Sequence, residues 1–176
     1  MIFSATKIKG AYIISLEKLE DERGFFARTW DKKKIEEYNL NSEIIQCNIS
    51  FNKEKGTLRG LHYQTKPYEE AKLVRCTNGE VFEVMIDLRK ESSSYLSWDG
   101  FSVNSKDYKM LYVPEGFALG FQTLEDNTEL FYQMSREYNS EYAAGLRWDD
   151  PKFKITWPLN VSKISKRDKS FTFVDN

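Results

Sequence analysis

Hydrophobic and polar residues alternate cleanly along residues 79–89, which read GEVFEVMIDLR. Successive side chains of an extended chain point to opposite sides, so this period of two predicts a β-strand. One face of the predicted strand carries Phe82, Val84, Ile86 and Leu88. The other face carries Val81, Glu83, Met85 and Asp87.

Similar strand-like runs recur along most of the chain, at a spacing of roughly 10 residues. They cover residues 43–48, 58–64, 71–77, 97–103, 109–113, 120–124 and 129–135. Many short strands separated by turn residues indicate a β-sandwich or barrel, and a closed or double-sheet architecture of this kind encloses a ligand-sized cavity. The length leaves no room for a second full core, so we expect one all-β domain over residues 1–176.

Glycine-containing turn sequences separate several of the predicted strands. They are Asn78-Gly79, Asp99-Gly100 and Pro114-Glu115-Gly116. Asn-Gly is the strongest hairpin sequence, because both residues accept the positive φ that a two-residue hairpin needs. One segment, residues 31–38, predicts instead a short, charged surface helix with Asp31 as its N-cap.

The composition argues against several classes of partner. Acidic residues number 27 and basic residues 26, and no basic stripe interleaved with aromatic residues indicates nucleic-acid binding. No run of about 18 apolar residues predicts a transmembrane helix, and the N-terminal MIFSATKIKG lacks the pattern of a signal peptide. Cys47 and Cys76 have no CxxC spacing, so we expect two reduced, half-buried thiols in a cytoplasmic protein that binds neither nucleic acid nor membrane.

Three titratable side chains lie on predicted strands among mostly apolar neighbours on the same face. His62, the only histidine, shares a face with Leu58, Gly60 and Gln64 in strict alternation. Lys72 and Tyr132 have similar surroundings. Such groups can converge inside one barrel, where burial shifts pKa values towards those of a proton-transfer site. Spacing alone leaves a structural role open, because a lone strand histidine is more often structural or exposed than catalytic.

Metal and phosphate motifs are missing from the sequence. A single histidine excludes a metal site made of several histidines within one subunit, and no carboxylate spacing indicates a site for a hard cation. Residues 23–26 (RGFF) predict a turn that opens an aromatic pair, and residues 116–121 (GFALGF) predict a strand entry with a bulge. Neither segment is a phosphate-binding loop, because the chain has neither the P-loop pattern nor GxGxxG.

Seven segments, in one order over residues 21–168, resemble the nucleotide-sugar 3,5-epimerase family. They are DERGFF (21–26), LRGLHYQ (58–64), AKLVRCTNGEVFEVMIDLRKES (71–92), LYVPEGFALGF (111–121), FYQMSREY (131–138), GLRWDDP (145–151) and ISKRD (164–168). The resemblance implies an all-β, cupin-type jelly-roll barrel with a few short peripheral helices, in a homodimer that exchanges a strand. It also implies a deoxysugar-biosynthetic reaction without cofactor or metal, on a nucleotide-linked 4-keto-6-deoxy sugar.

The resemblance implies catalytic roles for four residues. His62 matches the general base, and Asp168 matches the acidic residue that pairs with it and fixes its tautomer. Lys72 matches the cation beside the developing enolate oxygen, and Tyr132 matches the proton donor on the opposite face of the sugar ring. Donor and base must lie on opposite faces, because a proton returned to the same face would restore the original stereochemistry.

The resemblance also implies a binding shell around the nucleotide sugar. Its members are Arg23, Phe26, Gln46, Asn48, Arg59, Leu119 and Arg167. Arginine offers a bidentate fork to phosphate oxygens. Arg59 has the opposite strand parity to His62, and a bulge at Gly60 would turn both side chains to one side.

The chain departs from the family pattern at five positions, and two of them, Leu119 and Arg167, belong to this binding shell. The five departures are Leu119 for a usual histidine, Arg28 and Ala143 for usual glutamates, Cys47 for aspartate and Arg167 for lysine. We therefore expect an active epimerase whose nucleotide or sugar differs from that of the best-known family members, with CDP- and GDP-linked sugars as alternatives to a dTDP-linked one. The alternatives are an epimerase that inverts C3 alone, a nucleotide-sugar-binding protein that has lost catalysis, and a purely structural jelly-roll module.

Overall fold

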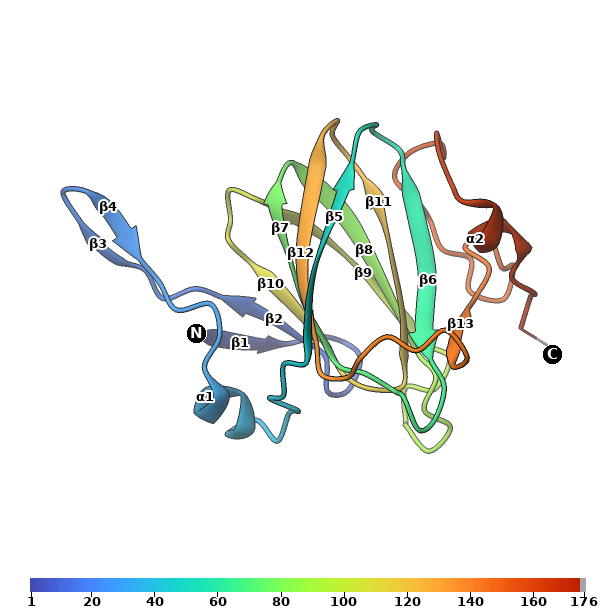
Figure 1. Cartoon of the computed structure of the whole chain (residues 1–176), viewed down its shortest axis with the longest axis horizontal. Coiled ribbons are helices and arrows are strands. Elements are labelled where there is room, and N and C mark those ends of the chain that lie inside the picture. Colours follow the sequence, from blue (N-terminus) through green and yellow to red (C-terminus); the bar gives the residue numbers. More distant parts are fainter. Residues whose placement is uncertain (175–176) are drawn as a thin grey trace.

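Two antiparallel β-sheets pack face to face, and a two-stranded hairpin extends away from them on the side opposite the C-terminal helix (Figure 1). The structure is a computed structural model and describes residues 1–174, so the last two residues of the expected domain lie outside it. The six-stranded sheet has the order β1 (Ile2–Ala5), β2 (Tyr12–Ser15), β10 (Met110–Val113), β7 (Lys72–Asn78), β12 (Thr128–Met134) and β5 (Gln46–Asn52). The five-stranded sheet has the order β13 (Ala143–Gly145), β6 (Leu58–Gln64), β11 (Phe117–Thr123), β8 (Glu80–Asp87) and β9 (Trp98–Asn104). The hairpin consists of β3 (Leu19–Asp21) and β4 (Gly24–Phe26).

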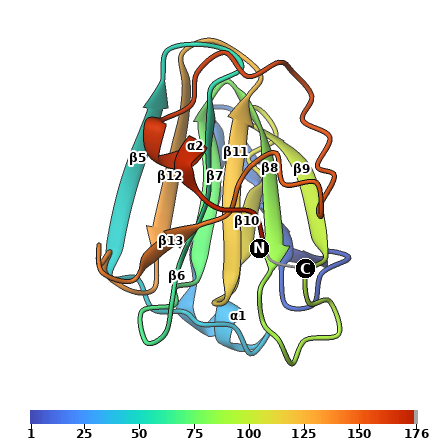
Figure 2. The ribbon, with the colours of Figure 1, turned by 90° about the vertical axis from the view of Figure 1, so that its right-hand side faces the viewer.

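The space between the two sheets holds the central core. Figure 2 shows the same ribbon with α2 and β13 towards the viewer. Both sheets contribute alternate apolar residues to this core, as a period of two requires. Members from the six-stranded sheet include Val74, Cys76, Leu111 and Leu130. Members from the five-stranded sheet include Val81, Met85, Val103 and Leu119. The all-β prediction is confirmed.

The outer faces of both sheets are also covered. The helix α1 (Lys32–Glu36) and the N-terminal segment cover the six-stranded sheet, with Ile35 packed against Leu73 and Tyr112 in one cluster. The segment that follows β13 covers the five-stranded sheet through Leu146 and Phe153. The strand β8 is therefore buried on both faces, which explains why Val84 and Ile86 are as completely buried as Val81 and Met85 on its other face.

The predicted helix is confirmed, because α1 lies within residues 31–38 and the Asp31 side chain accepts a hydrogen bond from the backbone N–H of Lys34. A second short helix, α2 (Lys166–Ser170), lies beside β6. Within residues 1–174, neither helix has the length and apolar character to cross a membrane.

Several local predictions are wrong. Asn78-Gly79 does not form a hairpin, because β7 and β8 on either side of it belong to different sheets. Asp99-Gly100 lies inside β9, and a side chain at Gly100 would meet the Phe82 ring at 2.4 Å, so packing rather than a turn requires this glycine. The strand expected over residues 43–48 is β5, which begins at Gln46.

The cysteines and the N-terminal strands also differ from the predictions. Cys47 is exposed and Cys76 is buried, so neither thiol is half-buried, although both are free. The strands β1, β2, β3 and β13, each of three or four residues, were not predicted. The Pro114-Glu115-Gly116 turn between β10 and β11 is present, with Gly116 at a φ of +78°.

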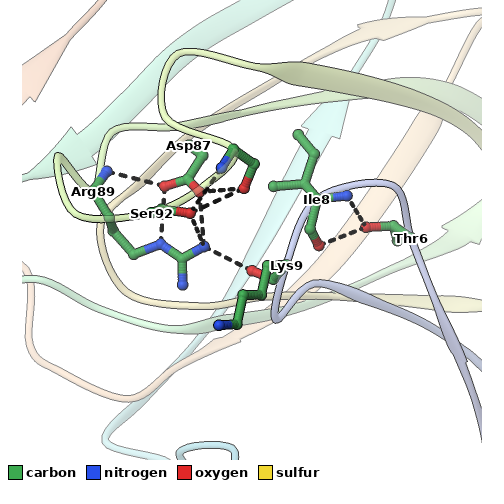
Figure 3. Close-up of polar contacts among 7 residues, drawn as sticks. Thr6, Ile8, Lys9, Asp87, Arg89 and Ser92 are labelled. Carbon is green, nitrogen blue, oxygen red and sulfur yellow. Dashed lines mark hydrogen bonds and ion pairs between the residues drawn. The ribbon is translucent and has the colours of Figure 1, made fainter.

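A buried ion pair ties the end of β8 to the turn between β1 and β2 (Figure 3). The Asp87 carboxylate accepts hydrogen bonds from the Arg89 guanidinium at 2.8 and 2.9 Å and from the Ser94 hydroxyl at 2.7 Å. Arg89 also donates to the Lys9 carbonyl at 2.7 Å. Burial alone would raise the pKa of Asp87, but the hydrogen bonds, led by those from Arg89, outweigh it and lower the pKa to about 2.

We expect Asp87→Asn to lower the free energy of unfolding by about 3 kcal/mol, because the change leaves Arg89 without its buried counter-ion. The ionised carboxylate stabilises the fold fully above the ordinary value of 3.8, and its contribution is lost as the pH falls to about 2. Urea denaturation at several pH values measures this dependence. Asp107→Asn is the matched control, because Asp107 pairs with Lys109 at the surface. Equal losses in the two variants would contradict the prediction.

Candidate active site

A cavity of about 710 Å³ opens between the two sheets, on the side of β5, β6 and β12. Most of the residues predicted from the sequence line it. Those on strands of the two sheets are Gln46, Asn48, Arg59, His62, Lys72, Leu119 and Tyr132. Arg167 lines it as well, from α2. Asp168 lies directly behind His62, whereas Arg23 and Phe26 lie on the projecting hairpin, outside this cavity.

A bulge in β6 turns two side chains of opposite parity into the same cavity. His62 pairs with Leu119 of β11 and Arg59 pairs with Phe121, so the register between the two strands shifts by one residue. Gly60, with a φ of +110°, takes up the extra residue, and a Cβ there would lie 2.7 Å from the Gly120 Cα. The predicted bulge at Gly60 is confirmed.

A buried carboxylate orients the histidine. His62 Nε2 lies 2.8 Å from Asp168 Oδ1, and the Gly60 N–H donates to Asp168 Oδ2 at 3.1 Å. The Ser165 hydroxyl caps α2 by accepting from the Asp168 N–H, which holds the carboxylate in place. Burial would raise the pKa of Asp168, but the hydrogen bond from His62 and the other donors hold it below its ordinary value. Asp168 thereby orients the imidazole through Nε2, and Nδ1 is the ring nitrogen that Asp168 does not contact.

A lysine and two glutamates also line the cavity. Lys72 Nζ lies 2.6 Å from Glu70 Oε1, and the two side chains are 11 % and 3 % exposed. Glu83 of β8 is 1 % exposed and also lines the cavity. Burial raises the pKa of Glu83 to about 8, although the charge of Lys72 opposes this.

Tyr132 reaches the cavity from the six-stranded sheet, whereas His62 reaches it from the five-stranded sheet. Its neighbours on the same strand face, Leu130 and Met134, line the cavity too, which confirms the predicted face of β12. Burial raises the pKa of Tyr132, and the charge of Arg59 partly offsets this. The phenol therefore stays protonated at neutral pH and can act as a proton donor.

Three lining residues that bear on the chemistry were not predicted from the sequence. Tyr138 follows β12 and lines the cavity, and its hydroxyl accepts a hydrogen bond from Arg167 Nη1 at 3.4 Å. Glu70 precedes β7 in a loop, and a loop has no alternating pattern from which the direction of a side chain can be predicted. Glu83 could have been recognised, because it is the single carboxylate between Val81 and Met85 on an otherwise buried apolar strand face.

The two-sheet fold, with an imidazole–carboxylate pair and a phenol inside, defines a jelly-roll protein of the cupin class with the groups needed for proton transfer. The model of the dTDP-4-dehydrorhamnose 3,5-epimerase family matches residues 5–176. The chain belongs to this family. This family agrees with the resemblance seen in the sequence, and the cupin-type jelly-roll prediction is confirmed.

Several proteins that carry the name of this family are similar to this chain over nearly its whole length. The dTDP-4-dehydrorhamnose 3,5-epimerase of Shigella flexneri is 39 % identical over 93 % of this chain and 90 % of its own. The crystal structure of the Bacillus anthracis enzyme with TDP and pyrophosphate bound is 31 % identical with a TM-score of 0.94, covering 98 % of this chain and 99 % of its own. The Legionella pneumophila dTDP-6-deoxy-D-glucose-3,5-epimerase in complex with dTDP-4-keto-L-rhamnose is 32 % identical with a TM-score of 0.90, covering 98 % and 92 %.

Gly60→Ala tests whether the bulge depends on glycine. We expect the positive φ to lower the free energy of unfolding by about 1–3 kcal/mol. The clash of the new Cβ with β11 should lower it further, again by about 1–3 kcal/mol. Gly24→Ala is the control, because Gly24 has a φ of +129° and a Cβ added there would meet nothing within 4 Å, so it carries the backbone strain alone. Chemical denaturation of both variants separates the two effects, and equal losses would show that the close approach to Gly120 is unimportant.

Proposed function

We propose that the chain epimerises C3 and C5 of a nucleotide-linked 4-keto-6-deoxy sugar in deoxysugar biosynthesis, with dTDP-4-dehydro-6-deoxyglucose as the first candidate substrate. The observation that carries the proposal is the placement of His62 and Tyr132 on opposite sheets across one cavity. Membership of the family and the nucleotide sugar bound to the Legionella relative support the substrate class.

His62 is the proposed base. The ketone at C4 acidifies the C–H bonds at C3 and C5, and His62 takes the proton while Asp168 stabilises the imidazolium that forms. The electron pair moves into an enolate, and the Tyr132 hydroxyl returns a proton to the same carbon from the opposite face. Tyr132 and His62 then exchange protons with solvent, which restores both groups. Inversion at the second centre repeats these steps.

Lys72 is the proposed cation for the enolate. Its ammonium group lies in the cavity and is largely removed from water, where a fixed charge stabilises an anion strongly. Glu70 holds the ammonium at 2.6 Å and so fixes its position. Gln46, Asn48, Arg59 and Arg167 line the same cavity and are the proposed contacts for the nucleotide and its phosphates.

We also propose that the active protein is a homodimer in which the hairpin reaches the partner. Leu19 and Phe26 of the hairpin are 68 % and 67 % exposed, which is unusual for large apolar side chains. The strand β5 is an unpaired sheet edge beside the cavity, with Ile49 64 % exposed. A hairpin of one subunit laid along this edge of the other would cover both surfaces and bring Arg23 and Phe26 to the cavity.

The neighbouring reactions and the compartment follow from the same proposal. A dehydratase must supply the 4-keto-6-deoxy sugar, and a reductase or aminotransferase must consume the 4-keto product. Cytoplasmic location stays a prediction, and the two free cysteines are compatible with a reducing compartment. The C3-only epimerase and the non-catalytic binding protein remain the alternatives, and Leu119 beside His62 is the departure that favours the second.

Proton exchange in D2O tests the reaction. We expect the protein to place deuterium at C3 and C5 of dTDP-4-keto-6-deoxyglucose, or of its CDP or GDP counterpart, as followed by NMR. His62→Ala should lower both exchange and inversion by about 100-fold or more, because the base is lost. Tyr132→Phe should lower inversion to the same degree while His62 still exchanges a proton on its own face, and Tyr95→Phe, on an exposed residue, is the control.

The outcomes of this experiment distinguish the alternatives. Exchange at C3 alone identifies a C3 epimerase. Binding without exchange identifies a nucleotide-sugar-binding protein. A wild-type rate of inversion in purified His62→Ala or Tyr132→Phe would refute the assigned roles.

Arg23→Ala tests the proposed dimer. We expect the variant to remain dimeric in analytical ultracentrifugation. Its KM for the nucleotide sugar should be about tenfold higher or more, because a phosphate contact from the partner's hairpin is lost. Arg147→Ala is the control, because Arg147 also pairs with an aspartate two residues away and lies outside the cavity. A monomeric wild-type protein with full activity would exclude the arrangement.

A further inference from the structure

The carboxyl group of Glu83 is enclosed in an apolar environment on its own sheet. Glu83 lies directly opposite Phe121 of β11 and Phe101 of β9, whose side chains pack against the central core. Directly paired residues of neighbouring strands point to the same side, so a phenyl ring stands on each side of the carboxyl group. Among the described residues, neither of its oxygens has a hydrogen-bond partner.

The groups that face Glu83 from the other sheet leave it without a dedicated counter-ion. Lys72 is the cation whose charge lowers the pKa of Glu83, and its ammonium is held by Glu70 at 2.6 Å. The other titratable groups on that side are Cys76, which senses the charge of Glu83, and Tyr132. Arg59 and His62 line the cavity from β6 and are bound to Asn52 and Asp168. Two carboxylates with one ammonium in a buried cluster would leave an uncompensated negative charge.

We propose that Glu83 holds a proton at neutral pH and acts as a neutral hydrogen-bond donor to the substrate oxygen on which negative charge develops. The inference rests on the proposed function and adds a catalytic residue to it. Glu70 forms an ion pair with Lys72, so a protonated Glu83 leaves the cluster neutral overall. A protonated Glu83 side chain has one hydrogen-bond donor, its O–H group. A substrate oxygen in the cavity that Glu83 lines can accept this hydrogen bond.

The chemistry of the reaction favours a neutral donor at this place. An ionised Glu83 would repel the enolate, whereas a protonated carboxyl in an apolar site strengthens its hydrogen bond as charge moves onto the oxygen. Lys72 and Glu83 would then share one task, with the ammonium supplying charge and the carboxyl supplying a directed hydrogen bond. No proton needs to leave Glu83, so the group is ready for the next turnover.

The proton on Glu83 can be measured without substrate. In the full-length protein labelled with ¹³C at the glutamate carboxyl carbon, we expect one resonance to titrate with a midpoint near 8 and to disappear in Glu83→Gln. In Glu70→Gln the midpoint should fall, because Lys72 then becomes the counter-ion of Glu83. A Glu83 resonance that titrates near the ordinary value of 4.5 would overturn the proposal.

Stability provides a second measurement in case the resonance is broad. A fold that holds this proton loses stability relative to the unfolded chain as the pH rises from about 4.5 to about 8, because the unfolded chain has already released it. Glu83→Gln should therefore melt at an increasingly higher temperature than the wild type over this range. Glu80→Gln makes the same chemical change at the start of β8, outside the cavity, and should show no such trend.

Kinetics test the role of the donor. Glutamine keeps an uncharged donor, so Glu83→Gln should lower kcat by less than about tenfold, whereas Glu83→Leu should lower it by about 100-fold or more, as loss of an oxyanion donor does. The wild-type kcat should fall as the pH rises through about 8, and Glu83→Gln should lack this fall. Equal losses in the Gln and Leu variants would show that the charge of Glu83 is required and would overturn the proposal. A midpoint near 8 in a protein that epimerises none of the nucleotide sugars would support the proton on Glu83 and count against the proposed function.

Discussion

The Asp168 carboxylate joins the parts of the chain on which the site depends. One oxygen binds His62 Nε2 and the other accepts from the Gly60 N–H, while the backbone N–H of Asp168 is held by the cap of α2. The bulge in β6, the orientation of the imidazole and the position of the C-terminal helix therefore depend on one another. Asp168 is 3 % exposed, so its charge is tolerated only because these donors surround it. A change at any one of the three places is expected to reach the other two.

The cavity concentrates polar groups in a place that the rest of the fold makes apolar. Both sheets are covered on their outer faces, and apolar side chains fill the space between them beyond the cavity. Water is thereby kept from Lys72, Glu70 and Glu83, and each charge acts more strongly than it would at the surface. This placement has a cost in stability, because buried charges must be paired or neutralised. The pair of Lys72 with Glu70 and a proton on Glu83 together meet that requirement.

Three of the departures from the family pattern lie in two separate places. Leu119 and Ala143 line the cavity near His62, where they bear on how a sugar lies against the base. Arg28 lies at the base of the hairpin, paired with Asp31, and bears on the proposed contact between subunits. The candidate proton-transfer groups lie together in spite of these changes. Differences of this kind are expected to alter the choice of substrate more than the chemistry.

The sequence by itself determined the kinds of element and the inward faces of the strands. A period of two in residues 79–89 and the apolar neighbours of Lys72 and Tyr132 reflect local geometry, which each strand imposes on its own residues. The motif resemblance supplied Asp168, which no spacing argument reaches from His62. Even the Gly60 bulge was foreseeable, because Arg59 and His62 could share one cavity only with an extra residue between them.

Tertiary structure alone decided which elements meet. Asn78-Gly79 has the residues of a hairpin, yet it joins two different sheets, because pairing with β12 and β11 involves far more hydrogen bonds than one turn can direct. Gly100 is explained only by the Phe82 ring that lies over it. The buried cluster of Glu70, Lys72 and Glu83 arises from a loop and two strands of different sheets. Burial and the lack of a free counter-ion among the described residues are properties of that assembly, so the protonation of Glu83 follows from the packing of the two sheets and not from its place in the sequence.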